Sequence, residues 1–337
     1  MEYTQQDFKS KLEIKWCPGC GDYAVHASVL RALPVIAEDL NYTKERFAFV
    51  SGIGCSSRFP YYVNCYGFHG IHGRASAIST GVKVANPRLS VWQLTGDGDA
   101  LAIGGNHFIH AIRRNIDINI LLFNNQIYGL TKGQYSPTTA KGYVTNSSPF
   151  GTVERPFRPG ELTIGSRGTF FARCLDVDLK TSVDVMVEAA KHKGTSVVEV
   201  LVNCVIYSDG VHSWISSKED RPDRTIVLEH GKPMIFGKNN NKGLVLDGFN
   251  LKVVTLGENG ITEKDILVHD AKTDNPALHT MLANMTGPDM PIAMGVIRAV
   301  KEETYEAAVH NQIKEVQAKT DVKTFDDLVG TIESWEM

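Results

Sequence analysis

Short apolar runs alternate with amphipathic segments along the first two thirds of the chain. Four of these runs predict strands: RFAFVS at 46–51, LSVWQLT at 89–95, DINILLFN at 117–124 and TSVVEVLVN at 195–203. The third and fourth contain few polar residues, which is typical of strands that are buried on both faces of a parallel sheet. The pattern therefore predicts a sheet with both faces covered.

Helical spacing of small and apolar residues fills the intervals between these runs. It predicts helices at 22–40, 73–86, 100–114 and 182–193. Pro34 should break or kink the first, and Pro87 should end the second. Strands that alternate with helices imply right-handed strand–helix–strand units, so we expect an α/β fold with an open, mostly parallel sheet.

The character of the chain changes after about Ser213. Lysine and aspartate become dense, 239–241 is a run of asparagines that predicts an exposed turn, and 297–319 predicts a polar amphipathic helix. We expect an α/β domain at 1–214. The remainder, 215–337, is expected to be a C-terminal extension that forms a lid or a subunit interface.

Composition excludes several classes of function. The 337 residues are 42% hydrophobic and 22% charged, as in ordinary globular proteins, and the formal net charge is −3. This charge indicates no nucleic-acid or membrane surface. No apolar run approaches the roughly 18 residues of a membrane span, and the polar N-terminus has no signal-peptide core. We expect a cytoplasmic protein.

Four of the six cysteines stand at positions that are typical of metal ligands. Cys17 and Cys20 share a turn rich in glycine and proline, Cys55 follows one predicted strand, and Cys204 closes another. Loops after parallel strands meet at one edge of the sheet, so four thiolates could hold Zn²⁺ or a [4Fe–4S] cluster. A structural zinc site usually has two close pairs, so one pair favours the cluster.

The alternative is a Cys-x-x-Cys turn with two unrelated buried cysteines. Cys65 and Cys174 have no partner motif, and we expect them to be small core residues.

A second group of residues predicts a site for Mg²⁺ and a diphosphate. Asp97 stands between two glycines at the end of a predicted strand, and Asn125 ends the next strand. A carboxylate, a carboxamide oxygen and the backbone carbonyl of Ile127 are the hard oxygen ligands that Mg²⁺ prefers. The alternative is a common Gly-Asp-Gly turn with a plain loop after it.

Two further residues could face a ligand. Lys132 follows the metal-ligand segment and could pair with a substrate carboxylate, or be a solvated surface lysine. His72 precedes a small-residue helix, where a diphosphate could bind, or is a loop histidine with a protein partner.

Together these segments resemble a known family, the β subunits of 2-oxoacid:ferredoxin oxidoreductases, and most closely the 2-oxoglutarate type. The resemblance covers about residues 15 to 210. It is carried by WCPGCG at 16–21, SGIGCSSR at 51–58, HGR at 72–74, GDGD at 96–99 and NNQIYGLTKGQ at 124–134.

The resemblance implies a thiamine diphosphate-binding fold of the pyrophosphate-domain type, and it implies roles for individual residues. It implies [4Fe–4S] ligands at Cys17, Cys20, Cys55 and Cys204, and Mg²⁺ ligands at Asp97, Asn125 and Ile127. It implies contacts with thiamine diphosphate at Ile53, Gly54, Cys55, Ser56, His72, Gly98, Asp99, Gly129 and Leu130. Lys132 and His72 are the expected catalytic residues.

The implied reaction is oxidative decarboxylation of 2-oxoglutarate with coenzyme A to succinyl-CoA and CO₂, with electrons passing through the cluster to ferredoxin. The implied partners are an α (and γ) subunit or a fused α/γ chain, in a dimer of heterodimers. Pyruvate or another 2-oxoacid is an alternative substrate. The competing classes of protein are a non-redox thiamine diphosphate-dependent decarboxylase, a structural zinc protein and a module that carries only a cluster.

Overall fold

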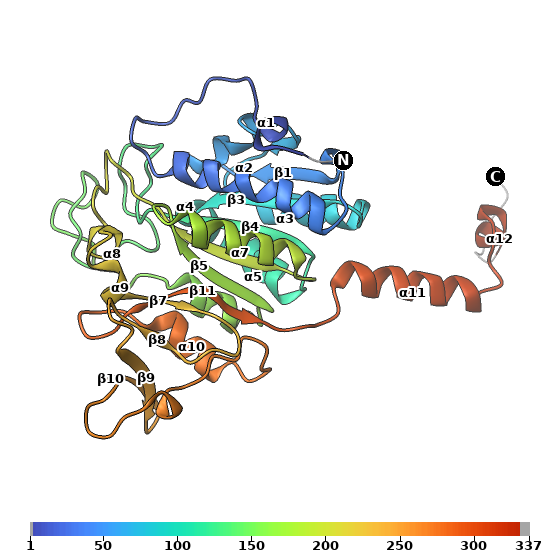
Figure 1. The fold of residues 1–337 in the computed structure, drawn as a ribbon. Helices are drawn as coiled ribbons and strands as arrows, with labels where there is room; N and C mark the ends of the chain where they lie inside the picture. The colour runs from blue at the N-terminus through green and yellow to red at the C-terminus, as the bar shows by residue number, and fades with distance from the viewer. Residues whose placement is uncertain (1–2, 331–337) are drawn as a thin grey trace.

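The protein centres on one large sheet (Figure 1). In the computed structural model, which describes residues 3–330, eight strands have the order β2-β1-β3-β4-β6-β5-β11-β7. Six strands are parallel, whereas β11 pairs with β5 in the antiparallel sense and carries β7 beside it. The strands are β1 Phe47–Ser51, β2 Tyr66–His69, β3 Ser90–Gly96, β4 Ile118–Asn124, β5 Phe170–Leu175, β6 Ser196–Leu201, β7 Thr225–Leu228 and β11 Ile292–Ala299. The prediction of an open, mostly parallel α/β sheet is confirmed.

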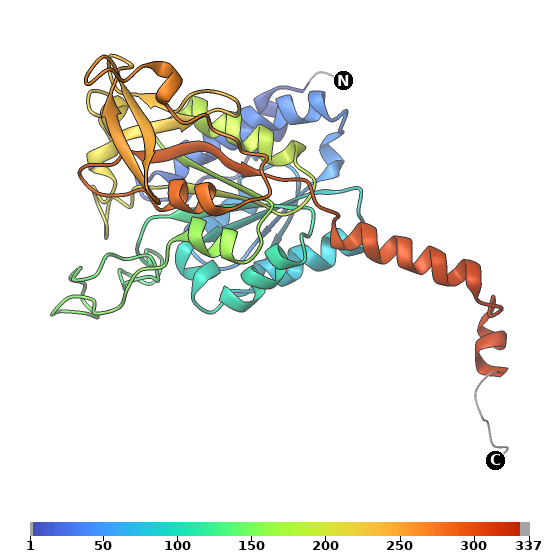
Figure 2. The same ribbon diagram turned by 90° about the horizontal axis from the view of Figure 1, so that it is seen from below.

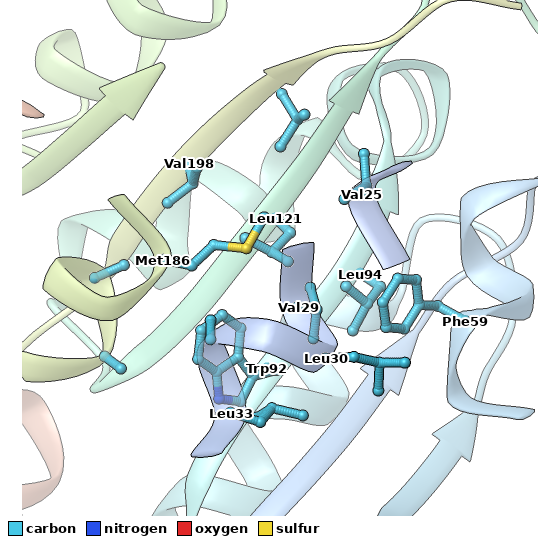
Figure 3. Close-up of a cluster of buried hydrophobic side chains, with 14 of the residues drawn as sticks. Val25, Val29, Leu30, Leu33, Phe59, Trp92, Leu94, Leu121, Met186 and Val198 are labelled. Atoms are coloured by element: carbon cyan, nitrogen blue, oxygen red, sulfur yellow. The ribbon is translucent and has the colours of Figure 1, made fainter. Parts of the chain in front are cut away.

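Helices cover both faces of this sheet (Figures 1 and 2). One face carries α2 Asp22–Asp39 and α7 Leu179–Lys191. The other carries α3 Ala75–Ala85, α5 Gly105–Arg113, α6 Pro159–Gly165 and α10 Ala277–Asn284. Figure 3 shows the first interface, where Val29 and Leu33 of α2 and Met186 of α7 pack against the sheet. Burial of these side chains, at roughly 25 cal/mol per Å² of apolar surface, holds the layers together.

The structure differs from the sequence prediction at two of the expected helices. Helix α2 continues through Pro34 to Asp39, so the expected break is wrong; its buried face fixes the helix although proline removes one backbone donor. The helix expected at 100–114 is two helices, α4 Asp97–Leu101 and α5. At the break, a Cβ on Gly104 would come within 2.3 Å of the Asp99 carbonyl oxygen.

The last third is partly built into the main sheet, through β7 and β11. The amphipathic helix expected at 297–319 therefore begins as a strand, and only α11 Tyr305–Lys319 is helical. Between β7 and β11 lies a small antiparallel sheet of order β10-β9-β8, formed by β8 Ile235–Phe236, β9 Lys242–Asp247 and β10 Asn250–Thr255. The asparagine turn joins β8 to β9, with Asn240 in the left-handed region at φ 49°.

The C-terminal helices, α11 and α12 Phe325–Gly330, extend away from the body (Figures 1 and 2). The elements not yet named are all short. They are α1 Gln5–Phe8, α8 Ser213–Ser216, α9 Arg221–Arg224 and the 3₁₀ turns η1 Lys44–Arg46, η2 Ser56–Tyr61 and η3 Glu263–Asp265. The expected domain boundary between residues 214 and 215 stays a prediction. The last residues of the expected C-terminal extension, 331–337, lie outside the described residues. Among the described helices, none combines the length and the apolarity that crossing a bilayer requires.

Candidate functional site

The loops that follow β1, β3 and β4 enclose a cavity of about 440 Å³. These loops meet because the strands are parallel neighbours, so their carboxyl ends lie at one edge of the sheet. Every residue expected to contact thiamine diphosphate or Mg²⁺ lines this cavity: Ile53, Gly54, Cys55, Ser56, His72, Asp97, Gly98, Asp99, Asn125, Ile127, Gly129 and Leu130. The structure thus brings these residues together, while the individual ligand roles stay predictions.

Asp97 is a buried carboxylate at the floor of the cavity. Its Oδ2 accepts hydrogen bonds from the hydroxyls of Ser136, at 2.6 Å, and Thr138. Burial raises the pKa of Asp97 to about 6, although both hydroxyls lower it. The sequence reasoning missed these hydroxyls, which lie about forty residues downstream; the hydroxyl-rich stretch 136–139 was the signal.

Asp99 has a different role, because its carboxylate is occupied by the protein. Oδ1 accepts from the backbone N–H groups of Ile53 at 3.1 Å and Gly73 at 2.7 Å, and it lies 2.8 Å from Nδ1 of His72. Oδ2 accepts from the Thr95 hydroxyl at 2.7 Å. Asp99 therefore ties together three loops of the cavity wall and leaves Nε2 of His72 as the free ring nitrogen.

The turn after β4 has an unusual backbone. Gln126 and Lys132 are non-glycine residues in the left-handed region, at φ 56° and 76°. The N–H of Ile127 donates to Oδ1 of Asn125 at 3.1 Å, and the turn is closed by the N–H of Tyr128, which donates to the Gln134 carbonyl at 2.9 Å. Lys132 is exposed at the tip of this turn and does not line the cavity, unlike the predicted cofactor contacts.

Gly98 is needed because a side chain at this position would meet an aromatic ring. A Cβ at this position would come within 2.2 Å of the Tyr128 ring. The hydroxyl of Tyr128 also donates to the Gly98 carbonyl at 3.0 Å. The missing side chain therefore admits the aromatic ring, which forms one wall of the cavity.

The cavity is acidic. Asp22, Asp97 and Asp99 line it, and its lining residues include no lysine or arginine. Asp22 is buried, and its Oδ2 has no hydrogen-bond partner among the described residues. Burial and the neighbouring Asp176 raise the pKa of Asp22 to about 7. Buried carboxylates are stabilised by a cation, so the site suits a positively charged group or a metal-bound anion.

A buried polar chain supports Asp97 from behind. The Asn124 side chain donates to Glu199 at 2.7 Å and accepts from Thr138 at 2.9 Å. Glu199 in turn pairs with Nε of Arg173 at 2.7 Å. Sequence reasoning missed this chain, because no motif links one residue on each of β4, β5 and β6. The first asparagine of the pair at 124–125 is thus a structural residue of the site.

The cysteine-bearing loops are joined to one another by hydrogen bonds. Nε1 of Trp16 donates to the Cys55 carbonyl at 2.7 Å, which fixes the turn that contains Cys17 and Cys20 against the β1 loop. The N–H of Gly21 donates to the Asn203 carbonyl at 3.1 Å, which joins the same turn to the segment that carries Cys204. A Cβ on Gly21 would meet Asp176 at 2.1 Å, so only glycine permits this approach.

The four cysteines expected to bind a cluster lie close enough for their charges to interact, Cys20 with Cys55 and Cys204, and Cys55 with Cys17. A Cβ on Gly129 would lie 3.4 Å from Sγ of Cys55 and 3.7 Å from Sγ of Cys204. Burial, with the negative charge of Asp22 next in importance, raises the pKa of Cys20 and raises that of Cys55 to about 12. The remaining two cysteines lie elsewhere: Cys174 is buried in the core and Cys65 packs against it.

Within residues 3–330, no group of three or more histidine, cysteine, aspartate or glutamate side chains is arranged to hold a single metal ion. The predicted Mg²⁺ set contains one such side chain, Asp97, beside a carboxamide and a carbonyl. A four-iron cluster holds its thiolates on different irons, so the four sulfurs stand farther apart than the ligands of one ion.

Comparisons with known proteins give three further findings. Residues 52–200 match the family described as the thiamine pyrophosphate enzyme, C-terminal TPP binding domain. A relative from Mycobacterium tuberculosis named 2-oxoglutarate oxidoreductase subunit KorB is 47% identical over 309 residues, which are 91% of this chain and 81% of the relative. The 2-oxoglutarate synthase subunit KorB of Archaeoglobus fulgidus is 43% identical, over 60% of this chain and 74% of that one.

A solved structure has the same fold. It is 2-oxoglutarate:ferredoxin oxidoreductase from Magnetococcus marinus with 2-oxoglutarate, coenzyme A and succinyl-CoA bound, and it superimposes with a TM-score of 0.77 at 27% sequence identity. The match covers 98% of this chain and 97% of that one. The chain therefore belongs to the KorB family, the β subunits of 2-oxoglutarate oxidoreductases.

Proposed function

We propose that this chain is the β subunit of a 2-oxoglutarate:ferredoxin oxidoreductase that uses thiamine diphosphate, Mg²⁺ and a [4Fe–4S] cluster. One observation carries the proposal: Cys55 lines the cavity that Asp97 and Asn125 also line, and the sulfurs of Cys55 and Cys204 both lie beside Gly129. The proposed diphosphate site and the thiol group would thus share one wall. The family relationship supports the same function, since its named members are 2-oxoglutarate oxidoreductase and synthase subunits.

The residues of the cavity fit thiamine diphosphate and Mg²⁺. The buried carboxylate of Asp97 would be stabilised by a cation, and Mg²⁺ accepts hard oxygen ligands of this kind. Asp97, Asn125 and the Ile127 carbonyl would hold the metal. Nε2 of His72, the ring nitrogen that Asp99 leaves free, would face the diphosphate. When bound, thiamine diphosphate supplies the electron sink for decarboxylation of a 2-oxoacid.

The thiol group fits an iron–sulfur cluster. Buried thiols with raised pKa values are poor thiolates by themselves, and iron would supply the missing positive charge. Gly129 keeps the space beside Cys55 and Cys204 free of a side chain. Cys17, Cys20, Cys55 and Cys204 would hold the cluster, and the loops that carry them are already joined through Trp16 and Gly21.

This chain contributes only part of the active site. Its cavity offers no lysine or arginine to bind the carboxylates of 2-oxoglutarate, and Lys132 stands outside it on an exposed turn. We propose that an α-type partner closes the cavity, supplies further cations, and contributes the coenzyme A site. Lys132 would then face the substrate across that interface. Ferredoxin would accept the electrons.

The test is an anaerobic assay of this chain co-expressed with its α-type partner. We expect 2-oxoglutarate and coenzyme A together to reduce ferredoxin or a viologen, and pyruvate to do so poorly. Faster reduction with pyruvate or another 2-oxoacid would overturn the substrate assignment but leave the class. No reduction with any 2-oxoacid, from a complex that contains cluster and thiamine diphosphate, would favour the non-redox decarboxylase instead.

A further inference from the structure

Helices α11 and α12 form an arm, residues 305–330, that leaves the body at the end of β11 and extends away from it (Figures 1 and 2). The root of the arm is fixed to the body. The Asn115 side chain donates to the carbonyls of Glu302 and Glu303 at 3.3 and 3.2 Å, and the N–H of Asp117 approaches Oε2 of Glu306 at 3.5 Å. The direction of the arm is therefore set by these contacts at its root.

One face of α11 is apolar and largely exposed. Tyr305, Val309, Ile313 and Val316 recur at helical spacing and form a stripe along the helix. Tyr305, Ile313 and Val316 are 41%, 46% and 57% exposed. Isolated helices of about 12–15 residues are marginally stable in water, because most helical stability comes from packing of an apolar face. The stripe therefore requires a packing partner.

Charge along the arm indicates which partner fits. Acidic Glu302 and Glu303 stand at the root, whereas Lys319 ends α11 beside the stripe. When a second copy of the arm is laid antiparallel with Val309 opposite Val316, Lys319 lies opposite Glu306 of the other root, three residues after Glu303. We propose that α11 pairs antiparallel with α11 of a second copy of this chain, in an isologous contact between two β subunits.

A groove on the body, near the root of the arm, is complementary in charge to helix α12 at the far end of the arm. Helix α12 carries acidic residues and Phe325, which is 76% exposed. A groove of about 750 Å³ contains Arg113, Arg158 and Arg167 along with Ile109, Leu162 and Glu161. None of these arginines has an acidic partner within ion-pair distance in the described part of the chain.

This groove lies next to the arm's root. Arg113 and Arg167 also line an adjoining cavity, together with Glu302 and Glu303. In an antiparallel pair, the far end of each arm lies at the other copy's root. Helix α12 of one copy therefore enters the arginine groove of the other, where Phe325 meets apolar side chains and the carboxylates meet guanidinium groups.

Photo-crosslinking tests the pairing in the intact anaerobic complex, because it spares the cysteines. Benzoylphenylalanine replaces Val316 on the stripe or, as a matched control, Asn311 on the opposite face of the same exposed helix. The expected product from position 316 is a covalent dimer of this chain, with the crosslinked peptide containing Val309. The control should give no such product.

A charge exchange tests the register independently. Lys319→Glu should lower the yield of the dimer severalfold, because it places a negative charge beside the acidic root of the other copy. Adding Glu302→Lys and Glu303→Lys to the same chain should restore the yield, because the root then becomes positive. A crosslink from position 316 to any other polypeptide, equal yields from 311 and 316, or no dimer would overturn the proposal. These variants lie outside the cofactor cavity, so failure here leaves the proposed catalytic function standing.

Discussion

Asp97 and Asp99 lie two residues apart, yet their carboxylates face different partners. Asp97 accepts hydroxyl hydrogen bonds and is expected to hold the metal, while Asp99 receives two backbone N–H groups and lies against His72. Sequence reasoning placed both at the cofactor and both line the cavity. It could not separate their roles, because the partners come from segments up to 46 residues away in sequence.

The role of Asp99 can be tested by Asp99→Asn. The carboxamide oxygen can still accept from the Ile53 and Gly73 amides, but the negative charge beside His72 is lost. A charge-assisted hydrogen bond contributes roughly 1.5–3 kcal/mol, so we expect Mg²⁺-dependent thiamine diphosphate affinity to fall about tenfold or more in calorimetric titration. Unchanged affinity in this variant would remove Asp99 from the binding site.

Gly129 tests the thiol group. Gly129→Val places a branched side chain against the sulfurs of Cys55 and Cys204, whereas the control change Gly165→Val extends into open space on α6. We expect the first variant to fold with much less iron and acid-labile sulfide per chain, and the second to retain both. Full iron loading of Gly129→Val would show that no cluster occupies this space.

Lys132 tests the substrate side. Lys132→Ala should raise the KM for 2-oxoglutarate more than the KM for coenzyme A, because it removes a cation expected to face a carboxylate. Lys141→Ala, an exposed lysine further along the same loop, is the control. Equal effects on both substrates would exclude a substrate-specific role for Lys132.

At the scale of elements, the apolar runs predicted the four strands β1, β3, β4 and β6 to within a residue or two. Both faces of these strands are buried, so a continuous apolar run identifies them. The pattern did not identify β2, β5, β7 or β11 of the main sheet, nor β8, β9 and β10 of the small sheet. Strand β2 is an exposed edge, and β11 joins the sheet through contacts distant in sequence, information that a local pattern does not contain.

The end of α7 provides a prediction about pH. Burial lowers the pKa of His192 to about 4, and its Nε2 lies 2.9 Å from the Thr169 hydroxyl. The neutral ring is therefore the form that the folded state prefers, and stability is fully present above the unfolded pKa of about 6.5. It is lost as pH falls from about 6.5 towards 4.

Urea midpoints at pH 7.5 and 5.0 measure this effect. For His192 alone we expect a loss on the order of 1 kcal/mol between these pH values, after allowance for partial exposure. Buried His269 and His279, whose pKa values are also lowered by burial, add to it. His192→Gln should make the dependence shallower, and an unchanged slope would contradict the assignment.

At the scale of the whole molecule, one buried ion pair connects the main sheet to the C-terminal third. Arg173 on β5 pairs with Glu199 on β6 and also donates to the carbonyls of Ala283, at 3.0 Å, and Ala293, at 3.4 Å. Arg173 therefore contacts the C-terminal segments and also Glu199, which accepts a hydrogen bond from Asn124 beside the candidate site. This connection predicts that both parts unfold together.

Arg173→Met tests that coupling. It leaves Glu199 buried without its partner, which costs about 3–5 kcal/mol, so the urea midpoint should fall steeply. Arg173→Met combined with Glu199→Gln should recover much of the loss, because no uncompensated charge remains. Two separate unfolding transitions in the unsubstituted chain would show that its two parts are independent.

The position of Cys55 has a consequence for kinetics. Its side chain belongs at once to the wall of the candidate cofactor cavity and to the thiol group, so a donor and an acceptor bound at these two proposed sites would be close neighbours. Over such a gap electrons tunnel through fixed protein atoms without waiting for a loop or domain to move. In the proposed oxidoreductase, the intramolecular oxidation step should accordingly be insensitive to solvent viscosity, and the encounter with ferredoxin would be the step that viscosity slows.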